Sequence, residues 1–272
     1  MMTGTSRMVQ WRPTRNSERE TRSPELESLM HLNIGWLYGH EMNIYGDRGN
    51  VMTLARRAEW RGIDASITTI GLGEPLDPES IDLYFWGGGQ DREQIAVSRD
   101  LVGEKGQRLR AAIEADAPIL AVCGGYQLLG HSYHPFEGDD LPGIGALDVT
   151  SEAGHDRYIG NVVVEAGELG TLVGFENHSG KTWLGEGVPP LGSVRVGNGN
   201  NGQDGTEGAR YRNAIGCYLH GALLPKNTHL ADWLIERALE RKYGDVALEP
   251  LDDTSETDAH AGVVARALSL RR

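Results

Sequence analysis

The stretch Ile119–Gly130 reads ILAVCGGYQLLG, and its pattern predicts a strand, a sharp turn and a helix. The apolar run ends at Cys123, and Gly124 and Gly125 separate it from a segment with the pattern of an amphipathic helix. A side chain at such an elbow stands clear of the backbone, and the N-terminus of the following helix favours a thiolate and an oxyanion. Cys123 is therefore a candidate nucleophile. The alternative is an inert core cysteine, which is common for this residue type.

The composition limits the classes of protein to consider. The chain has 272 residues, enough for a sizeable core in one large α/β domain or two small ones. Its formal net charge of -13 argues against nucleic-acid binding, which needs a basic surface. The two cysteines, Cys123 and Cys217, lie far apart, so a reducing compartment is a simpler expectation than a disulfide framework. Without an apolar run of membrane-spanning length or a secretion signal, the expected location is cytoplasmic.

The two ends of the chain differ in composition from the rest. Residues 1–30 are rich in Arg, Ser, Thr and Glu and are expected to form a disordered leader, with translation starting at either Met1 or Met30. Residues 31–246 are expected to form the folded domain. Residues 247–272 turn acidic and then end in a short amphipathic piece, which predicts a loosely docked C-terminal tail.

The pattern between the two ends predicts an α/β fold. Up to residue 130, apolar runs alternate with helical patterns, which is typical of a mostly parallel central sheet flanked by helices. After about residue 140 the pattern changes to short strands and glycine-rich turns, so we expect added antiparallel strands. Within this part, the low-complexity segment 197–205 predicts a mobile hairpin loop.

A second glycine cluster follows the apolar run 81–86. Ligands of parallel sheets bind beyond the carboxyl ends of the strands, where Cys123 and the triple glycine 87–89 are both expected. Glycines there allow backbone N–H groups to approach a substrate carbonyl. The alternative is an ordinary flexible loop.

Among the nine histidines, His220 is the best candidate for a base. It directly follows the apolar strand 214–219, so it is expected at the same sheet edge as Cys123, where it can accept the thiol proton. His178 is the second candidate, because it lies in a polar segment at a strand end. No closely spaced Cys or His pairs occur, so no metal site is expected.

These features together resemble a known family. The elbow at Cys123, the glycine loop 87–89 and the sequence Tyr218-Leu219-His220-Gly221 are similar to class I (triad-type) glutamine amidotransferases, and more narrowly to their cobyric-acid-synthase-like branch. Within that branch, four phrases resemble the glutaminase subunits of lipid II isoglutaminyl synthases. They are YGDRGN (45–50), GGGQDREQ (87–94), GFENH (174–178) and HGALLPKN (220–227).

The resemblance implies a flavodoxin-like amidotransferase fold and a reaction. Such subunits hydrolyse L-glutamine to glutamate and ammonia, with Cys123 attacking the side-chain amide and His220 moving the protons. Backbone N–H groups of Gly88 and Gly124 would form the oxyanion hole, and Gln127 would lie near the substrate.

Arg157 corresponds to an arginine that holds substrate in these subunits. Independently of the resemblance, a guanidinium forks onto a carboxylate such as the α-carboxylate of glutamine. The alternative for Arg157 is an ordinary surface arginine.

The resemblance also implies a partner. The ammonia would pass to a MurT-like Mur ligase subunit, which amidates D-glutamate of lipid II to D-isoglutamine during peptidoglycan synthesis. No cofactor is expected in this subunit, because ATP and metal belong to the ligase. Many triad amidotransferases carry Glu two residues after the histidine, where this chain has Ala222. The sequence assigns no acid of this chain to the third position of the triad, and the resemblance implies that an aspartate of the partner supplies it.

Two alternative functions remain. A cobyrinic-acid-type synthase would need an ATP-dependent synthetase domain, for which this chain has neither room nor a phosphate-binding loop. A glutamine-binding or scaffold subunit without turnover would keep the fold, although Cys123 and His220 are both present.

Overall fold

The computed structural model describes residues 30–270, so the expected leader lies outside the described residues except for Met30. The first of two sheets is six-stranded and has the order β11-β12-β4-β3-β1-β2. Its strands are β1 (His31–Leu37), β2 (Asp64–Ile70), β3 (Leu83–Trp86), β4 (Ile119–Val122), β11 (Ala209–Tyr211) and β12 (Ala214–Cys217). All neighbouring strands pair in parallel except β11, which pairs antiparallel with β12.

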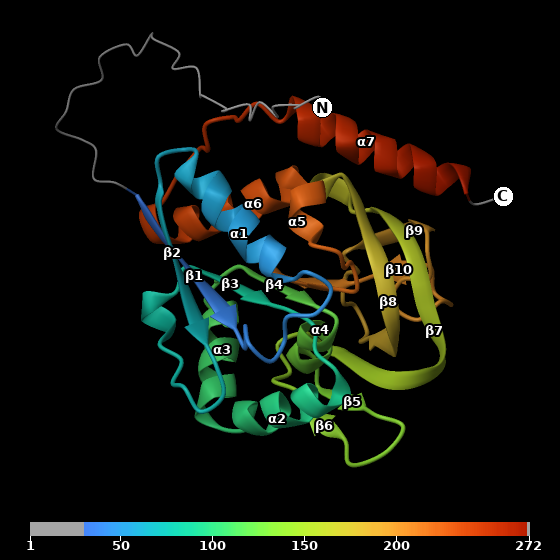
Figure 1. The fold of residues 1–272 in the computed structure, drawn as a ribbon. Coiled ribbons are helices and arrows are strands. Elements are labelled where there is room, and N and C mark those ends of the chain that lie inside the picture. Colours follow the sequence, from blue (N-terminus) through green and yellow to red (C-terminus); the bar gives the residue numbers. More distant parts are fainter. Residues whose placement is uncertain (1–29, 271–272) are drawn as a thin grey trace, which may run out of the picture.

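The order β2-β1-β3-β4-β12 is the flavodoxin-like arrangement, which confirms the predicted fold class. In Figure 1, α1 and α6 lie on one side of this sheet and α2 and α3 on the other. The longer helices are α1 (Arg48–Glu59), α2 (Asp91–Leu101), α3 (Glu104–Glu114), α6 (Thr228–Tyr243) and α7 (Thr254–Ser269). The shorter ones are α4 (Gly124–Leu129), α5 (Leu223–Lys226) and the 3-10 turns η1 (Pro78–Ser80) and η2 (Gly167–Leu169).

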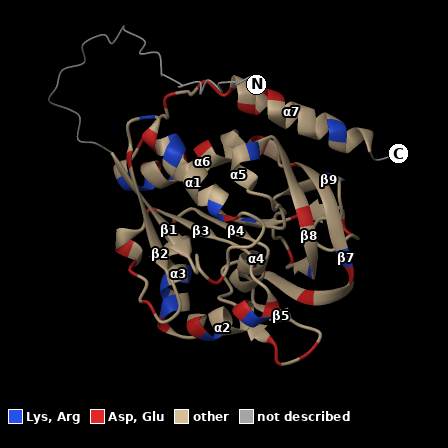
Figure 2. Ribbon diagram, in the orientation of Figure 1, with Lys and Arg blue, Asp and Glu red and all other residues tan. Residues whose placement is uncertain are grey.

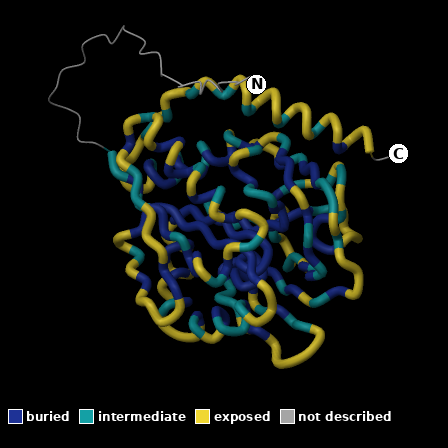
Figure 3. Tube along the Cα trace, in the orientation of Figure 1, coloured by how far each residue is buried: buried dark blue, intermediate teal, exposed yellow. Residues whose placement is uncertain are grey.

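Helices on both faces explain the central sequences. Strands β3 (LYFW) and β4 (ILAV) are buried at every position, because side chains on either face of a doubly covered sheet are shielded from water. Figure 3 shows this buried centre in dark blue. Figure 2 shows charged residues on the helices and outer loops, while β3 and β4 carry none.

The second sheet carries the added strands. It has the order β10-β9-β7-β5-β6, and β8 pairs with β7 in a long antiparallel hairpin. Its strands are β5 (Ser132–His134), β6 (Leu141–Pro142), β7 (Val149–Glu165), β8 (Thr171–Leu184), β9 (Gly192–Val196) and β10 (Thr206–Glu207). The pairs are antiparallel except β5 with β7. The β7–β8 hairpin is longer than the separate short strands that the sequence predicts.

The segment 197–205 differs from the predicted mobile loop, because buried groups fix it. The Glu176 carboxylate accepts hydrogen bonds from the backbone N–H groups of Asn198 (2.9 Å) and Gly199 (3.2 Å). Asn200 and Asn201 are fully buried. Glycine-rich composition indicates turns, but it does not reveal a buried carboxylate that holds them.

The C-terminal part forms helix α7, which lies along the second sheet beside β9 in Figure 1 and contacts β7, β8 and β9. Asp253, at its start, forms an ion pair with the buried Arg57 of α1 (2.7 Å). His260 donates from Nδ1 to the Lys226 carbonyl of α5 (2.8 Å). The domain limits at 30/31 and 246/247 stay a prediction. None of the helices between residues 30 and 270 is long and apolar enough to cross a membrane.

Candidate active site

Cys123 occupies the predicted elbow between β4 and α4. Its φ of 54° is in the left-handed region, which costs a non-glycine residue roughly 1–3 kcal/mol. Hydrogen bonds hold it there: its N–H donates to the Cys217 carbonyl (2.8 Å), and its carbonyl accepts from the Gln127 N–H (2.9 Å). The surrounding backbone therefore imposes a strained conformation on the residue proposed as nucleophile.

The two glycines after Cys123 are required by close packing. A Cβ at Gly124 would lie 2.7 Å from Gln94 Nε2, and a Cβ at Gly125 would lie 2.8 Å from the Trp86 carbonyl oxygen. The prediction of an amphipathic helix here is wrong, since all six residues of α4 are buried. Helix α4 lies between the two sheets, so it has no solvent face.

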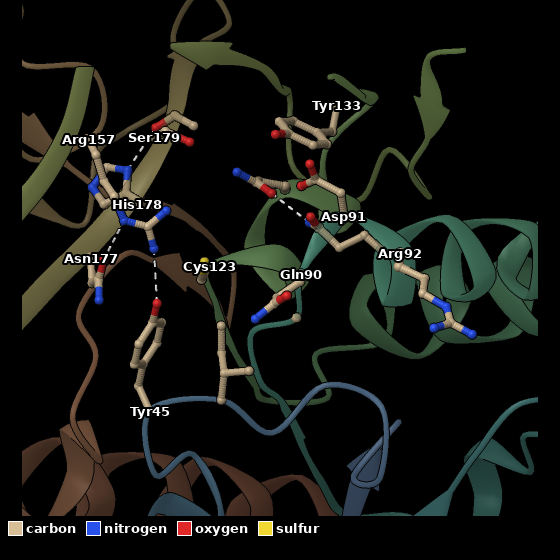
Figure 4. A pocket seen from close by; sticks show the side chains of 15 residues that line it. Tyr45, Gln90, Asp91, Arg92, Cys123, Tyr133, Arg157, Asn177, His178 and Ser179 are labelled. Carbon is tan, nitrogen blue, oxygen red and sulfur yellow. Dashed lines mark hydrogen bonds between the residues drawn. The ribbon is translucent and has the colours of Figure 1, made fainter. Parts of the chain in front are cut away.

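Cys123 opens onto a cavity of about 440 Å³, a volume suited to a small ligand. Figure 4 shows Arg157 and His178 on one side of Cys123 and Gln90 and Asp91 on the other. Most of the lining is polar. The lining residues are Ile44, Tyr45, Gly89, Gln90, Asp91, Arg92, Gln94, Cys123, Gln127, Tyr133, Arg157, Asn177, His178, Ser179 and Gly180.

The Cys123 thiol is protonated in this conformation. Burial raises its pKa to about 12, and the nearby Asp47 carboxylate raises it further, while the Gly124 N–H and the Arg157 charge act in the opposite direction. The expected preference for a thiolate is therefore not met here. A six-residue buried helix does not outweigh the loss of water around the sulfur.

Arg157 projects from β7 into the same cavity, at its exposed side. Its Nε donates to the Asn177 side-chain oxygen (2.8 Å) and its Nη2 donates to the Tyr45 hydroxyl (3.0 Å). A guanidinium has five donors, so it keeps free donors for a carboxylate. The structure thus brings Arg157 and Cys123 to one cavity, as the sequence predicts.

His220 follows β12 at the sheet edge that also carries Cys123, since Cys217 pairs with Val122. Its backbone exchanges two hydrogen bonds with Phe175 of β8 (2.8 and 3.2 Å), but neither ring nitrogen has a partner among residues 30–270. The ring is fully buried, is absent from the cavity lining, and packs against Tyr45 with 4.9 Å between ring centroids. Cys123 and His220 therefore share an edge without a hydrogen bond between them.

The charges around His220 are unfavourable to a proton. Burial lowers its pKa to about 3, helped by His178 and by the Arg157 charge, and no acidic group contributes. A neutral imidazole can act as a base, but no described residue forms a hydrogen bond that would orient its ring. This agrees with the sequence, which has Ala222 where many triad amidotransferases carry the glutamate that orients the histidine.

His178, the second candidate base, is fixed in a different way. Its ring stacks on Tyr218 at 3.7 Å between centroids, and Nδ1 donates to the Gly180 carbonyl (2.7 Å). Nε2, which lacks a partner among the described residues, is then the unprotonated nitrogen. Burial lowers the pKa of His178 to about 4. Because it lines the cavity, His178 stays open as an alternative base.

Gln127 lines the cavity, but its amide is already bonded at both ends. Its Oε1 accepts from Gln94 Nε2 (2.6 Å) and its Nε2 donates to the Tyr218 hydroxyl (3.0 Å). The Tyr218 hydroxyl is also bonded to Thr182 (2.7 Å), and Thr182 to Ser151 (2.7 Å). We call this series the polar chain. The polar chain joins α2 to β7 and β8. It fixes the position of the Gln127 side chain and occupies hydrogen-bonding groups that a ligand could otherwise use.

Gly88, a predicted oxyanion donor, has an unexpected partner. Its N–H donates to Asp47 Oδ2 (2.7 Å), and Asp47 is fully buried. Burial raises the pKa of Asp47 to about 7, and the Gly88 N–H opposes that rise. The Gly88 N–H is thus occupied, while Gly124 follows Cys123 directly at the start of α4.

Between residues 30 and 270, no group of three or more His, Cys, Asp or Glu side chains is arranged to hold a metal ion. The absence of a metal and of a cofactor stays a prediction.

The CobB/CobQ-like glutamine amidotransferase domain matches residues 33–228 of this chain. The chain belongs to this family. The resemblance seen in the sequence phrases is thereby confirmed.

Two relatives of this amidotransferase cover most of it. The "Lipid II isoglutaminyl synthase (glutamine-hydrolyzing) subunit GatD" of Staphylococcus aureus (strain N315) is 41% identical over 241 residues, which span 88% of this chain and 97% of the relative. The subunit of the same name from Streptococcus pneumoniae (strain ATCC BAA-255 / R6) is 40% identical over 225 residues, 82% of this chain and 86% of the relative. Among solved structures, the glutaminase domain of Trypanosoma brucei CTPS with bound acivicin has a TM-score of 0.50 at 11% identity, covering 80% of this chain and 96% of that one. It shows the fold alone.

In this amidotransferase, the sequence predicted only a minority of the residues that line the cavity as site residues. Cys123, Gln127 and Arg157 meet as predicted, and His178 joins them, whereas His220 lies beside the cavity behind Tyr45. The roles of these residues stay predictions. Tyr45 and Asp47 were missed as site residues, although they belong to the phrase YGDRGN, which had carried the resemblance.

Proposed function

We propose that this chain is the glutaminase subunit of a lipid II isoglutaminyl synthase. It hydrolyses L-glutamine to glutamate and ammonia, and a MurT-like ligase uses the ammonia and ATP to convert D-glutamate of lipid II to D-isoglutamine. The observation that carries the proposal is the strained Cys123 elbow facing Arg157 across one polar cavity. The family and the GatD relatives support the same reaction. This work belongs in the cytoplasm, where ATP is available.

Each residue has a chemical task. Arg157 binds the α-carboxylate of glutamine through charge-assisted hydrogen bonds and leaves the side-chain amide at Cys123. The sulfur attacks the amide carbon after its proton passes to the neutral His220. His220 then returns the proton to the leaving ammonia, and water hydrolyses the thioester to glutamate. The Gly124 N–H stabilises the tetrahedral oxyanion, together with the Gly88 N–H once that group is released from Asp47.

We also propose that the partner completes the triad. Both ring nitrogens of His220 lack partners among residues 30–270, and no acidic group affects its pKa. A carboxylate brought by the ligase would orient one nitrogen and raise the pKa of His220 towards neutrality. Metal and ATP chemistry are assigned to the ligase, and this subunit is proposed to work without a cofactor.

The test is ammonia release from L-glutamine by the purified chain, alone and with its ligase, for the wild type and for Cys123→Ala. We expect weak release by the chain alone, strong stimulation by the ligase, and none from Cys123→Ala in either case. Full activity without the ligase would refute the shared triad. If the complex released no Cys123-dependent ammonia, only the glutamine-binding or scaffold function would remain.

A further inference from the structure

The segment Ile44–Asp47, which we call the latch, binds both backbone groups of Gly88. The Gly88 N–H donates to Asp47 Oδ2 (2.7 Å), and the Gly88 carbonyl accepts from the Ile44 N–H (3.3 Å). Gly88 also faces the nucleophile, since a Cβ added to it would lie 3.2 Å from Cys123 Cβ. A donor next to the sulfur is therefore held by a carboxylate and is not available to a developing oxyanion.

Tyr45, in the same segment, contacts two other functional residues. Its ring lines the cavity and packs edge-on against His220, and its hydroxyl accepts a hydrogen bond from Arg157 Nη2 (3.0 Å). Its φ of 55° is strained, and its side chain is 43% exposed, so few contacts fix it apart from these two. Tyr45 thus contacts the candidate base, which does not line the cavity, and takes up one of the donors of Arg157.

Asp47 itself is poorly satisfied. It is fully buried, and its Oδ1 has no hydrogen-bond partner among the described residues. Its negative charge also disfavours the Cys123 thiolate that attack on the substrate requires. After burial, Asp47 is the largest cause of the raised pKa of Cys123. Burying a carboxylate with one unpaired oxygen costs free energy. A conformation in which that oxygen gains a hydrogen bond would lower this cost.

We propose that the latch holds the free subunit in an inactive state, and that glutamine binding releases it. The inference rests on the proposed glutaminase function. The α-carboxylate of glutamine competes with the Tyr45 hydroxyl for Arg157, and a carboxylate can accept two parallel hydrogen bonds from a guanidinium. When Tyr45 leaves Arg157, the short segment moves with it, His220 gains access to the cavity, and Asp47 releases the Gly88 N–H.

The experiment uses the full chain with three substitutions that separate the parts of the latch. Asp47→Asn keeps an acceptor for Gly88 but removes the charge, Asp47→Ala removes both, and Tyr45→Phe keeps the ring on His220 but frees Arg157. Arg48→Ala, an exposed neighbour of the latch, is the control. Thermal unfolding checks that each variant is folded. If Asp47→Ala does not fold, Asp47→Asn, which has nearly the same shape as the native side chain, takes its place in the test.

The first measurement is the rate at which iodoacetamide alkylates Cys123, followed by mass spectrometry between pH 6 and pH 9. It does not depend on glutaminase activity. We expect Asp47→Asn and Asp47→Ala to raise the rate about 10-fold, which corresponds to one pKa unit of the thiol, with no change for Arg48→Ala. An unchanged or lower rate in the folded Asp47 variants would overturn the proposal.

The second measurement is glutamine hydrolysis by the chain alone and with its ligase. We expect Asp47→Ala to raise kcat/KM of the free chain about 10-fold, and Tyr45→Phe to lower KM about 5-fold, as expected for losing one competing hydrogen bond. Lower kcat in folded Asp47 variants, alone and in the complex, would make Asp47 a positioning residue for the glycine loop and end the latch proposal. If the wild-type complex released no ammonia, the glutaminase function would fail, while the alkylation rates would still show whether Asp47 restrains the thiol.

Discussion

The elbow at Cys123 and the loop at His220, which we propose to be two halves of one site, are built differently. At the elbow, the backbone groups of Cys123 are bonded on both sides, to Cys217 and to Gln127, and the strained φ is held by them. At His220, the backbone is bonded to Phe175, while the ring packs against Tyr45 and has no hydrogen-bond partner in the part of the chain that the structure describes.

The difference shows which part of the chemistry this chain contains by itself. Strand–turn–helix geometry depends on local sequence and on neighbouring parallel strands, so the nucleophile is fully positioned within the chain. The orientation of an imidazole needs a hydrogen-bond partner for its far nitrogen, and none is present between residues 30 and 270. The following predictions test this comparison between the Cys123 elbow, whose backbone is hydrogen-bonded on both sides, and the His220 loop, whose ring lacks a hydrogen-bond partner among the described residues.

The largest effect is expected from replacing the nucleophile. Cys123→Ser should lower kcat for glutamine hydrolysis in the ligase complex roughly 10⁴-fold or more, because a hydroxyl is far harder to ionise than a thiol. The measurement is ammonia release under saturating glutamine.

The matched control is Cys217→Ala. Cys217 is also a buried cysteine and lies on the neighbouring strand, with its thiol pKa raised by burial. Its loss should leave kcat within a few-fold while reducing stability by about 1 kcal/mol for the lost packing. Equal loss of activity in both variants would mean that packing, not nucleophilicity, explains the effect.

The second prediction concerns the choice of base. His220→Asn should reduce kcat roughly 10³-fold, within the usual range for losing general acid–base catalysis, whereas His178→Asn should cost less than about 10-fold. Both variants are assayed in the complex, with KM measured separately from kcat. The reverse order would identify His178, which already lines the cavity, as the base.

The third prediction concerns Glu207, which supports the His220 half by accepting the Tyr218 N–H (2.5 Å). Burial raises the pKa of Glu207 to about 8 from an ordinary value of 4.5. A raised pKa means that the folded state binds more protons than the unfolded state between these values, so stability is lost as pH rises through this window. Glu207→Gln removes this loss.

The measurement is chemical unfolding of both proteins at pH 5 and pH 8. The stability of Glu207→Gln relative to the wild type should increase by about 3 kcal/mol over this interval, since one pKa unit corresponds to about 1.4 kcal/mol. A constant difference between the two proteins would show that Glu207 is ionised throughout.

The smallest effect is expected at the clamp. Arg157→Lys keeps the charge but loses the forked geometry, so KM for glutamine should rise about 10-fold with little change in kcat. Kinetics with glutamine at several concentrations measure both constants. A change confined to kcat would move Arg157 from substrate binding to the chemical step.

The sequence predicted the Cys123 elbow better than it predicted the surroundings of His220. The alternation of strands and helices, the elbow and the position of His220 at the sheet edge follow from apolar runs, glycines and strand ends. The contact between Asp47 and Gly88 does not, because it joins residues 41 positions apart through one side-chain orientation. The burial of α4 was also missed, since sequence pattern alone does not show that a second sheet covers its outer face.

The polar chain from Gln94 through Gln127 and Tyr218 to Thr182 and Ser151 has a consequence for substrate choice. It ties the elbow that carries Cys123 to the β7–β8 hairpin, from which Arg157 projects into the cavity. The spacing between the Arg157 guanidinium and the Cys123 sulfur would then select amino acids by the length of their side chain. If Arg157 binds the α-carboxylate as proposed, we expect asparagine, which is one methylene shorter than glutamine, to be a poorer substrate, with a lower kcat/KM for ammonia release.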